Sequence, residues 1–158
     1  MKWLPWSVIL ALAAMPAWAA DPIVGRWLLT SQTIGGQKTQ IEELTLRINP
    51  SGAALEFAYS VPVRDIQFVS LRFTAKPDGT AADVTDANGK KVGTVKVTKT
   101  SATQYRVVLE GPGRPTANGA MTVSADGKTL TSESDSTPLT QTGGQSAVTH
   151  MVQVFARQ

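Results

Sequence analysis

The sequence predicts an all-β fold, an antiparallel up-and-down barrel of about 8–10 strands preceded by a cleaved signal peptide. Beyond Asp21, apolar residues recur with a period near two in short segments rich in Val, Ile, Thr, Phe and Tyr. Gly, Pro, Asn and Asp separate these segments at hairpin-scale distances. Beyond Asp21, no stretch keeps apolar residues at helical spacing long enough for a helix of three turns. We expect the sheet to close on itself, because closure removes exposed edge strands.

The first residues have the order of a secretory leader. Lys2 precedes an apolar run over residues 8–15, followed by Pro16 and the small residues Ala17 and Ala19. Signal peptidase reads that order, so we expect residues 1–19 to be a cleaved signal peptide. Residues 20–158 are then one periplasmic or secreted domain. An uncleaved anchor is the alternative, but prolines interrupt a run that would need about 20 apolar residues to span a membrane. We therefore expect no stable membrane anchor after cleavage.

The strands follow from the alternation and from the turn residues between them. The third expected strand is the clearest, because Leu55, Phe57, Tyr59 and Val61 share one face. Turn residues gather at 49–52, 76–79, 86–90 and 125–128. The expected strands are residues 26–33, 41–49, 54–61, 64–74, 82–85, 92–99, 104–110, 120–124, 129–135 and 148–156.

The fourth expected strand changes its apolar parity part of the way along. Ile66 and Phe68 occupy even positions, whereas Leu71 and Phe73 occupy odd ones. One extra residue in a strand moves all later side chains to the other face. A β-bulge near Val69 would therefore place both halves on the same side of the sheet.

Charge and cysteine content exclude several classes of partner. Without Lys2, the mature chain has 14 basic and 12 acidic residues, scattered without a Lys/Arg run. The chain therefore lacks the clustered positive charge that binding to nucleic-acid phosphates requires. The chain has no cysteine, which excludes disulfides, thiolate metal sites and a lipoprotein anchor.

Motifs at both ends of the mature chain carry a family resemblance. Gly25-Arg26-Trp27 is a G-x-W at the start of the first expected strand. Near the other end, residues 125–131 contain a tight turn, and a Val-rich last strand ends in Phe155-Ala156-Arg157-Gln158. With the number and spacing of the strands between them, the chain resembles the small exported bacterial lipocalin-like domains. That resemblance implies a lipocalin-like β-barrel.

The G-x-W has a physical role at that place. Gly25 lets the chain enter the barrel floor without a Cβ clash, and Trp27 plugs the narrow end. The resemblance implies that a basic residue from near the chain end lies over the indole, with Arg157 as the candidate by position and Arg106 as a rival. Such a cation contributes about 0.5–2 kcal/mol. Plain packing of Trp27 without an Arg partner is the alternative, and its role is architectural in either case.

The chemistry-bearing residues do not form a catalytic constellation. His150 is the only histidine, and a zinc site takes three or four ligands. No G-x-S-x-G is present to supply an activated serine. Glu42 and Glu43 point to opposite faces of a strand, and most Asp residues fall in turns, although Asp65 beside Arg64 could lie at a cavity mouth. We expect no enzyme activity, no catalytic residue, no metal and no cofactor.

The aromatic and aliphatic residues of the strands point to an interior instead. An interior of eight or more strands can hold one small ligand. We expect a small, mainly apolar molecule to bind there without chemistry, anchored by Arg64 at the rim. The alternative is a filled, structural barrel whose loops, such as residues 111–118, contact another envelope or secreted protein. A continuous apolar pocket of roughly 300 Å³ or more would favour binding. The expected ligand-binding residues are Leu55, Phe57, Tyr59, Phe68, Phe73, Tyr105 and Arg64.

Overall fold

The computed structural model describes residues 21–40, 43–63, 66–111, 116–137 and 148–158, with the backbone alone at 63, 67, 68 and 137. The expected signal peptide and Arg64 lie outside the described residues. In the part that is described, no helix is long and apolar enough to cross a membrane.

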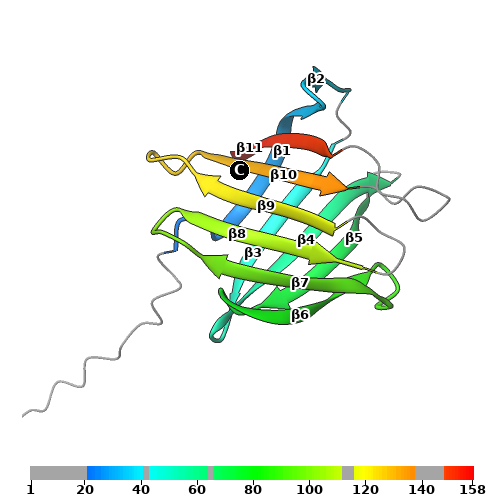
Figure 1. Ribbon diagram of the computed structural model, residues 1–158, viewed down its shortest axis with the longest axis vertical. Coiled ribbons are helices and arrows are strands. Elements are labelled where there is room, and N and C mark those ends of the chain that lie inside the picture. Colours follow the sequence, from blue (N-terminus) through cyan, green and yellow to red (C-terminus); the bar gives the residue numbers. More distant parts are fainter. Residues whose placement is uncertain (1–20, 41–42, 64–65, 112–115, 138–147) are drawn as a thin grey trace, which may run out of the picture.

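Strands account for most of the described chain, and they wrap around a common interior (Figure 1). They are β1 (Gly25–Ile34), β2 (Gln37–Lys38), β3 (Thr45–Ser51), β4 (Ala54–Val63), β5 (Ile66–Ala75), β6 (Asp78–Asp86), β7 (Lys91–Lys99), β8 (Gln104–Glu110), β9 (Thr116–Val123), β10 (Thr129–Thr137) and β11 (Thr149–Arg157).

Ten of these strands form a closed antiparallel barrel, as the sequence predicts. Each pairs with its neighbour in the order β1-β3-β4-β5-β6-β7-β8-β9-β10-β11, and β11 pairs back onto β1. The closing register runs from Trp27 opposite Arg157 to Ile34 opposite Met151. β2 lies outside the ring as a short arm paired only with the end of β1. The ring therefore has no free edge strand.

The predicted bulge is confirmed, one residue from the expected position. Tyr59 of β4 pairs with Leu71 of β5, but the next residue, Ser60, pairs with Val69. Ser70 is thus the extra residue, and its hydroxyl donates to the Tyr59 carbonyl at 3.2 Å. After the bulge, Leu71 and Phe73 face the interior, whereas Ile66 at the start of β5 is 71% exposed.

Strand ends differ from the expectations where turn residues continue a strand. β3 runs through Pro50 to Ser51, so the expected turn at residues 49–52 narrows to Gly52 and Ala53. Gly52 has φ of 61°, which glycine adopts without steric cost. β6 and β9 begin earlier than expected, at Asp78 and Thr116, because pairing with the next strand extends them over polar residues.

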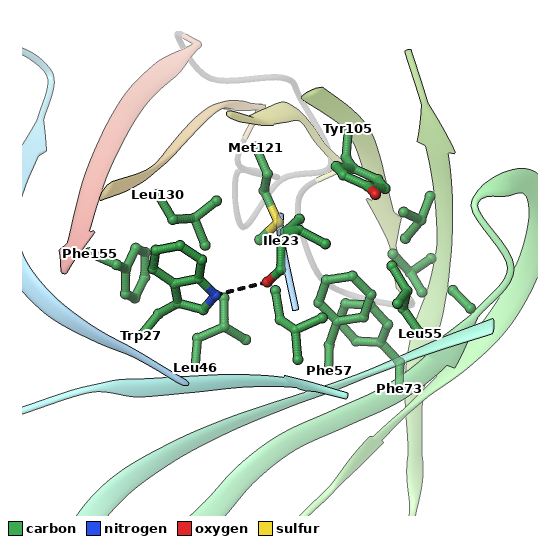
Figure 2. Close-up of a cluster of buried hydrophobic side chains, with 14 of the residues drawn as sticks. Ile23, Trp27, Leu46, Leu55, Phe57, Phe73, Tyr105, Met121, Leu130 and Phe155 are labelled. Carbon is green, nitrogen blue, oxygen red and sulfur yellow. Dashed lines mark hydrogen bonds between the residues drawn. The ribbon is translucent and has the colours of Figure 1, made fainter. Parts of the chain in front are cut away.

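The apolar core fills one end of the barrel (Figure 2). Ile23 enters it from the segment before β1, and the Trp27 Nε1–H donates to the Ile23 carbonyl at 2.9 Å. Phe57 and Phe73 stack with ring centroids 4.6 Å apart. The fully buried large side chains are Trp27, Tyr105, Phe57, Phe155, Ile23, Leu46, Ile48, Leu55, Leu130, Val84, Val95 and Val97.

Candidate functional site

A cavity of about 330 Å³ borders this core inside the barrel. Seven strands, β4, β5 and β7 to β11, contribute residues to its wall, together with Leu44 just before β3. Several of these side chains, including Tyr59, Leu71, Val107 and Leu109, are only partly buried although they face inward. The apolar part of the lining consists of Leu44, Leu71, Phe73, Val95, Val107, Leu109, Ala117, Ala120, Met121 and Met151.

The predicted interior residues lie at two different depths. Tyr59 and Phe73 line the cavity. Leu55, Phe57 and Tyr105 do not line it, because they are fully buried in the packed core. Alternate residues of one strand share a face but step along the barrel axis. Leu55, Phe57 and Tyr59 therefore pass from the packed end to the cavity, and their shared face alone does not distinguish them.

Two further predicted residues cannot be placed against the cavity. Phe68 belongs to β5 and pairs with Val61 in the register, but its side chain lies outside the described residues. Arg64, the expected rim anchor, also lies outside them.

Tyr105 belongs to a buried polar cluster that the sequence reasoning missed. Its hydroxyl donates to the carboxylate of Asp21, whose side chain is only 2% exposed, and Lys99 Nζ lies 2.6 Å from the same oxygen. Burial, followed by the hydrogen bond to Asp21 and the charge of Asp21, raises the pKa of Tyr105 far above its ordinary value. A buried carboxylate needs such partners, so the cluster fastens the segment before β1 across the packed end.

The partner of Trp27 is Arg157. Trp27 is fully buried, and the Arg157 guanidinium lies 4.2 Å from its ring centroid. Arg106, the rival candidate, is exposed on β8. Gly25 makes the approach possible: it has φ of 152°, and a Cβ there would lie 2.6 Å from Arg157 Nη1. The absence of a side chain at Gly25 therefore leaves room for Arg157 over the Trp27 indole.

Arg157 also fastens the chain that crosses the packed end. Its Nη1 donates to the Val24 carbonyl at 2.9 Å, its Nη2 to Pro22 at 2.5 Å and its Nε to Gly127 at 2.6 Å. One side chain from β11 thus holds the entry into β1 and the β9–β10 turn. These roles are structural and lie away from the cavity lining.

One side of the cavity is polar, and the sequence reasoning missed it. Ser132 and Ser134 of β10 and Gln153 of β11 line this side, whereas Ser70 of β5 lines the cavity from across the barrel and donates its hydroxyl to the Tyr59 carbonyl. The signal was available in the alternation of β10, where these serines share the face of buried Leu130. Tyr59 adds a phenol, and the desolvation that comes with its inward-facing, partly buried position raises its pKa above the ordinary value.

The side chain of His150 lies on the outer face of β11. It pairs with Asp135 across β10 and β11, and His150 Nδ1 is 2.7 Å from the Asp135 carboxylate. Both side chains are more than half exposed. Among the described residues, no group of three or more His, Asp or Glu side chains could hold a metal ion.

The architecture is that of a closed, antiparallel ten-strand barrel, which is compatible with a lipocalin-like barrel. No protein-family model matches the chain, and no curated protein matches it.

Proposed function

We propose that this protein is an exported, non-catalytic, lipocalin-like barrel that binds a small, mainly apolar molecule in its interior. The observation that carries the proposal is the cavity of about 330 Å³ with its largely apolar lining. This volume falls in the range of ligand pockets, which begins at roughly 300 Å³. The leader-like order of residues 1–19 supports export to the periplasm or beyond.

Apolar burial supplies the driving force for such binding. A ligand in the cavity removes its own surface and that of the partly exposed inner side chains from water. Each Å² of apolar surface removed from water contributes about 25 cal/mol. The rigid sheet around the cavity is already formed, so little ordering of the protein opposes binding.

Fluorescence of the neutral dye N-phenylnaphthylamine tests the proposal. The dye should brighten on binding wild-type protein, because its emission increases in apolar surroundings. Val107→Phe places a larger side chain in the cavity and should weaken dye binding strongly. Val108→Phe is the matched control, since Val108 is the next residue of β8 and alternates to the outer face.

Urea melts of both variants would show whether each barrel remains folded. If wild-type protein does not bind the dye, or both variants bind it as well as wild type does, the interior-pocket proposal fails. The better interpretation is then a structural barrel that contacts another exported protein through its loops.

A further inference from the structure

We propose that the cavity selects a neutral amphipathic molecule, one with an apolar body and a single uncharged hydrogen-bonding head such as an alcohol or an amide. This inference rests on the proposed function and defines its ligand class. The observation behind it is the division of the cavity wall into an uncharged polar side and an apolar side.

The polar side is a compact patch on two paired strands. In the β10–β11 register, Ser132 is opposite Gln153, and Ser134 is opposite Met151. The Ser132 and Ser134 hydroxyls donate no hydrogen bond to any described residue, although both line the cavity. They are therefore donors available to a bound molecule.

Gln153 is held in place beside these serines. Its Nε2 donates to Gln32 Oε1 at 2.8 Å, and Gln32 Nε2 donates to Thr39 Oγ1 at 3.1 Å. This chain directs one end of the Gln153 amide toward β1. Its carbonyl oxygen accepts no hydrogen bond from a described side chain and can serve as an acceptor for a ligand hydroxyl.

The apolar side lies across the barrel from this patch. In the ring of ten strands, β5 is five strands from β10 in either direction. Leu71 and Phe73 of β5 line the cavity there, and Val107 and Leu109 of β8 continue the apolar lining between β5 and β10. A ligand that spans the cavity therefore meets hydroxyls and an amide at one end and hydrocarbon at the other.

No charged side chain of the described lining is directed at this polar patch. Glu133 borders the cavity, but it is exposed and alternates outward between Ser132 and Ser134. An ionised head placed here would lose its hydration without gaining a counter-ion, whereas a hydroxyl needs only a hydrogen bond.

Three probes with the same ten-carbon chain separate the head groups: decanol, decanoate and decyltrimethylammonium. Each is titrated against bound N-phenylnaphthylamine at neutral pH, where decanoate is ionised. Decanol should displace the dye at a concentration at least about ten times lower than either ion, the factor that about 1.4 kcal/mol of selectivity gives.

The variants locate the head. The double variant Ser132→Ala/Ser134→Ala should weaken decanol by about 2- to 10-fold, the loss expected for one neutral hydrogen bond, while dye binding persists. Thr131→Ala, on the outer face of the same strand, is the matched control and should leave decanol unchanged. Ser132→Ala alone serves if the double variant does not fold.

The outcomes separate the two proposals. Absence of dye binding to wild-type protein defeats the proposed function and this inference together. Dye binding with equal displacement by all three probes leaves the function standing and overturns the neutral-head inference. Tighter binding of decanoate or of decyltrimethylammonium also overturns it.

Discussion

Replacing Arg157 by methionine should show how far the stability of the barrel depends on the contacts at its packed end. The guanidinium lies 4.2 Å from the Trp27 ring and donates to the carbonyls of Pro22, Val24 and Gly127. Methionine keeps an unbranched apolar stem over the indole but removes the charge and all the N–H donors. The substitution therefore measures the polar contacts with little loss of packing.

The expected loss follows from those contacts. A cation over an aromatic face contributes about 1 kcal/mol. Each of the three hydrogen bonds contributes about 1 kcal/mol once the exposure of Arg157 is taken into account. Because neighbouring contacts are not additive, we expect a loss of about 2–4 kcal/mol in the free energy of unfolding. That is a large part of the 5–15 kcal/mol, roughly, that stabilises natural domains.

Tryptophan fluorescence during urea unfolding is the assay. Trp27 is the only tryptophan beyond the expected leader, so the emission of the mature protein reports on the indole beneath Arg157. With a slope of about 2 kcal/mol per molar urea, the midpoint should fall by about 1–2 M. Arg106→Met is the matched control, because Arg106 is exposed on β8. If both variants lose the same free energy of unfolding, less than about 1 kcal/mol, the reasoning is refuted.

Three further predictions concern the core, pH dependence and processing. Trp27→Ala should cost about 3–5 kcal/mol, the range for emptying a large buried aromatic site, and a urea melt showing less than about 1 kcal/mol would mean that Trp27 is no core plug. Burial raises the pKa of both Tyr59 and Tyr105, which would ionise near their ordinary value of 10.0 when unfolded; stability should therefore fall as pH rises above 10. Tyrosinate absorbance should stay flat through pH 10 and rise only with unfolding, and an earlier, gradual rise would contradict this. N-terminal sequencing of the exported protein should return Ala20, whereas Met1 would contradict cleavage.

The bulge and the aromatic residues show how far alternation predicts structure. The parity change between Phe68 and Leu71 was sufficient to predict an extra residue, which the structure places at Ser70. A side-chain period of two fixes the face on which a residue lies, and closure follows from the need to avoid free edges. It does not fix depth along the barrel axis, so Phe57 and Phe73 could not be distinguished: they stack on each other, but only Phe73 lines the cavity.

The polar contacts were decided by pairings between distant parts of the chain. Gln32 and Gln153 meet because β1 pairs with β11, and Asp21 meets Lys99 and Tyr105 across the packed end. Neither set has a local motif, since each partner alone is compatible with a solvated surface position. For the serines of β10, alternation alone predicts that they share a face with Leu130. That they line one side of a cavity depends on the strands opposite them in the barrel.

By itself, the sequence determined the all-β class, the approximate positions of the strands, the need for a bulge and the place of the G-x-W, because these depend on local alternation and on turn chemistry. Only the tertiary structure decided that Arg157 covers Trp27, that the core occupies one end of the barrel and that a cavity with a polar and an apolar side remains beside it. The physical reason is that volume and polarity inside a closed barrel are properties of facing walls. Those walls come from strands far apart in the chain, and the local pattern of any one strand does not specify what stands opposite it.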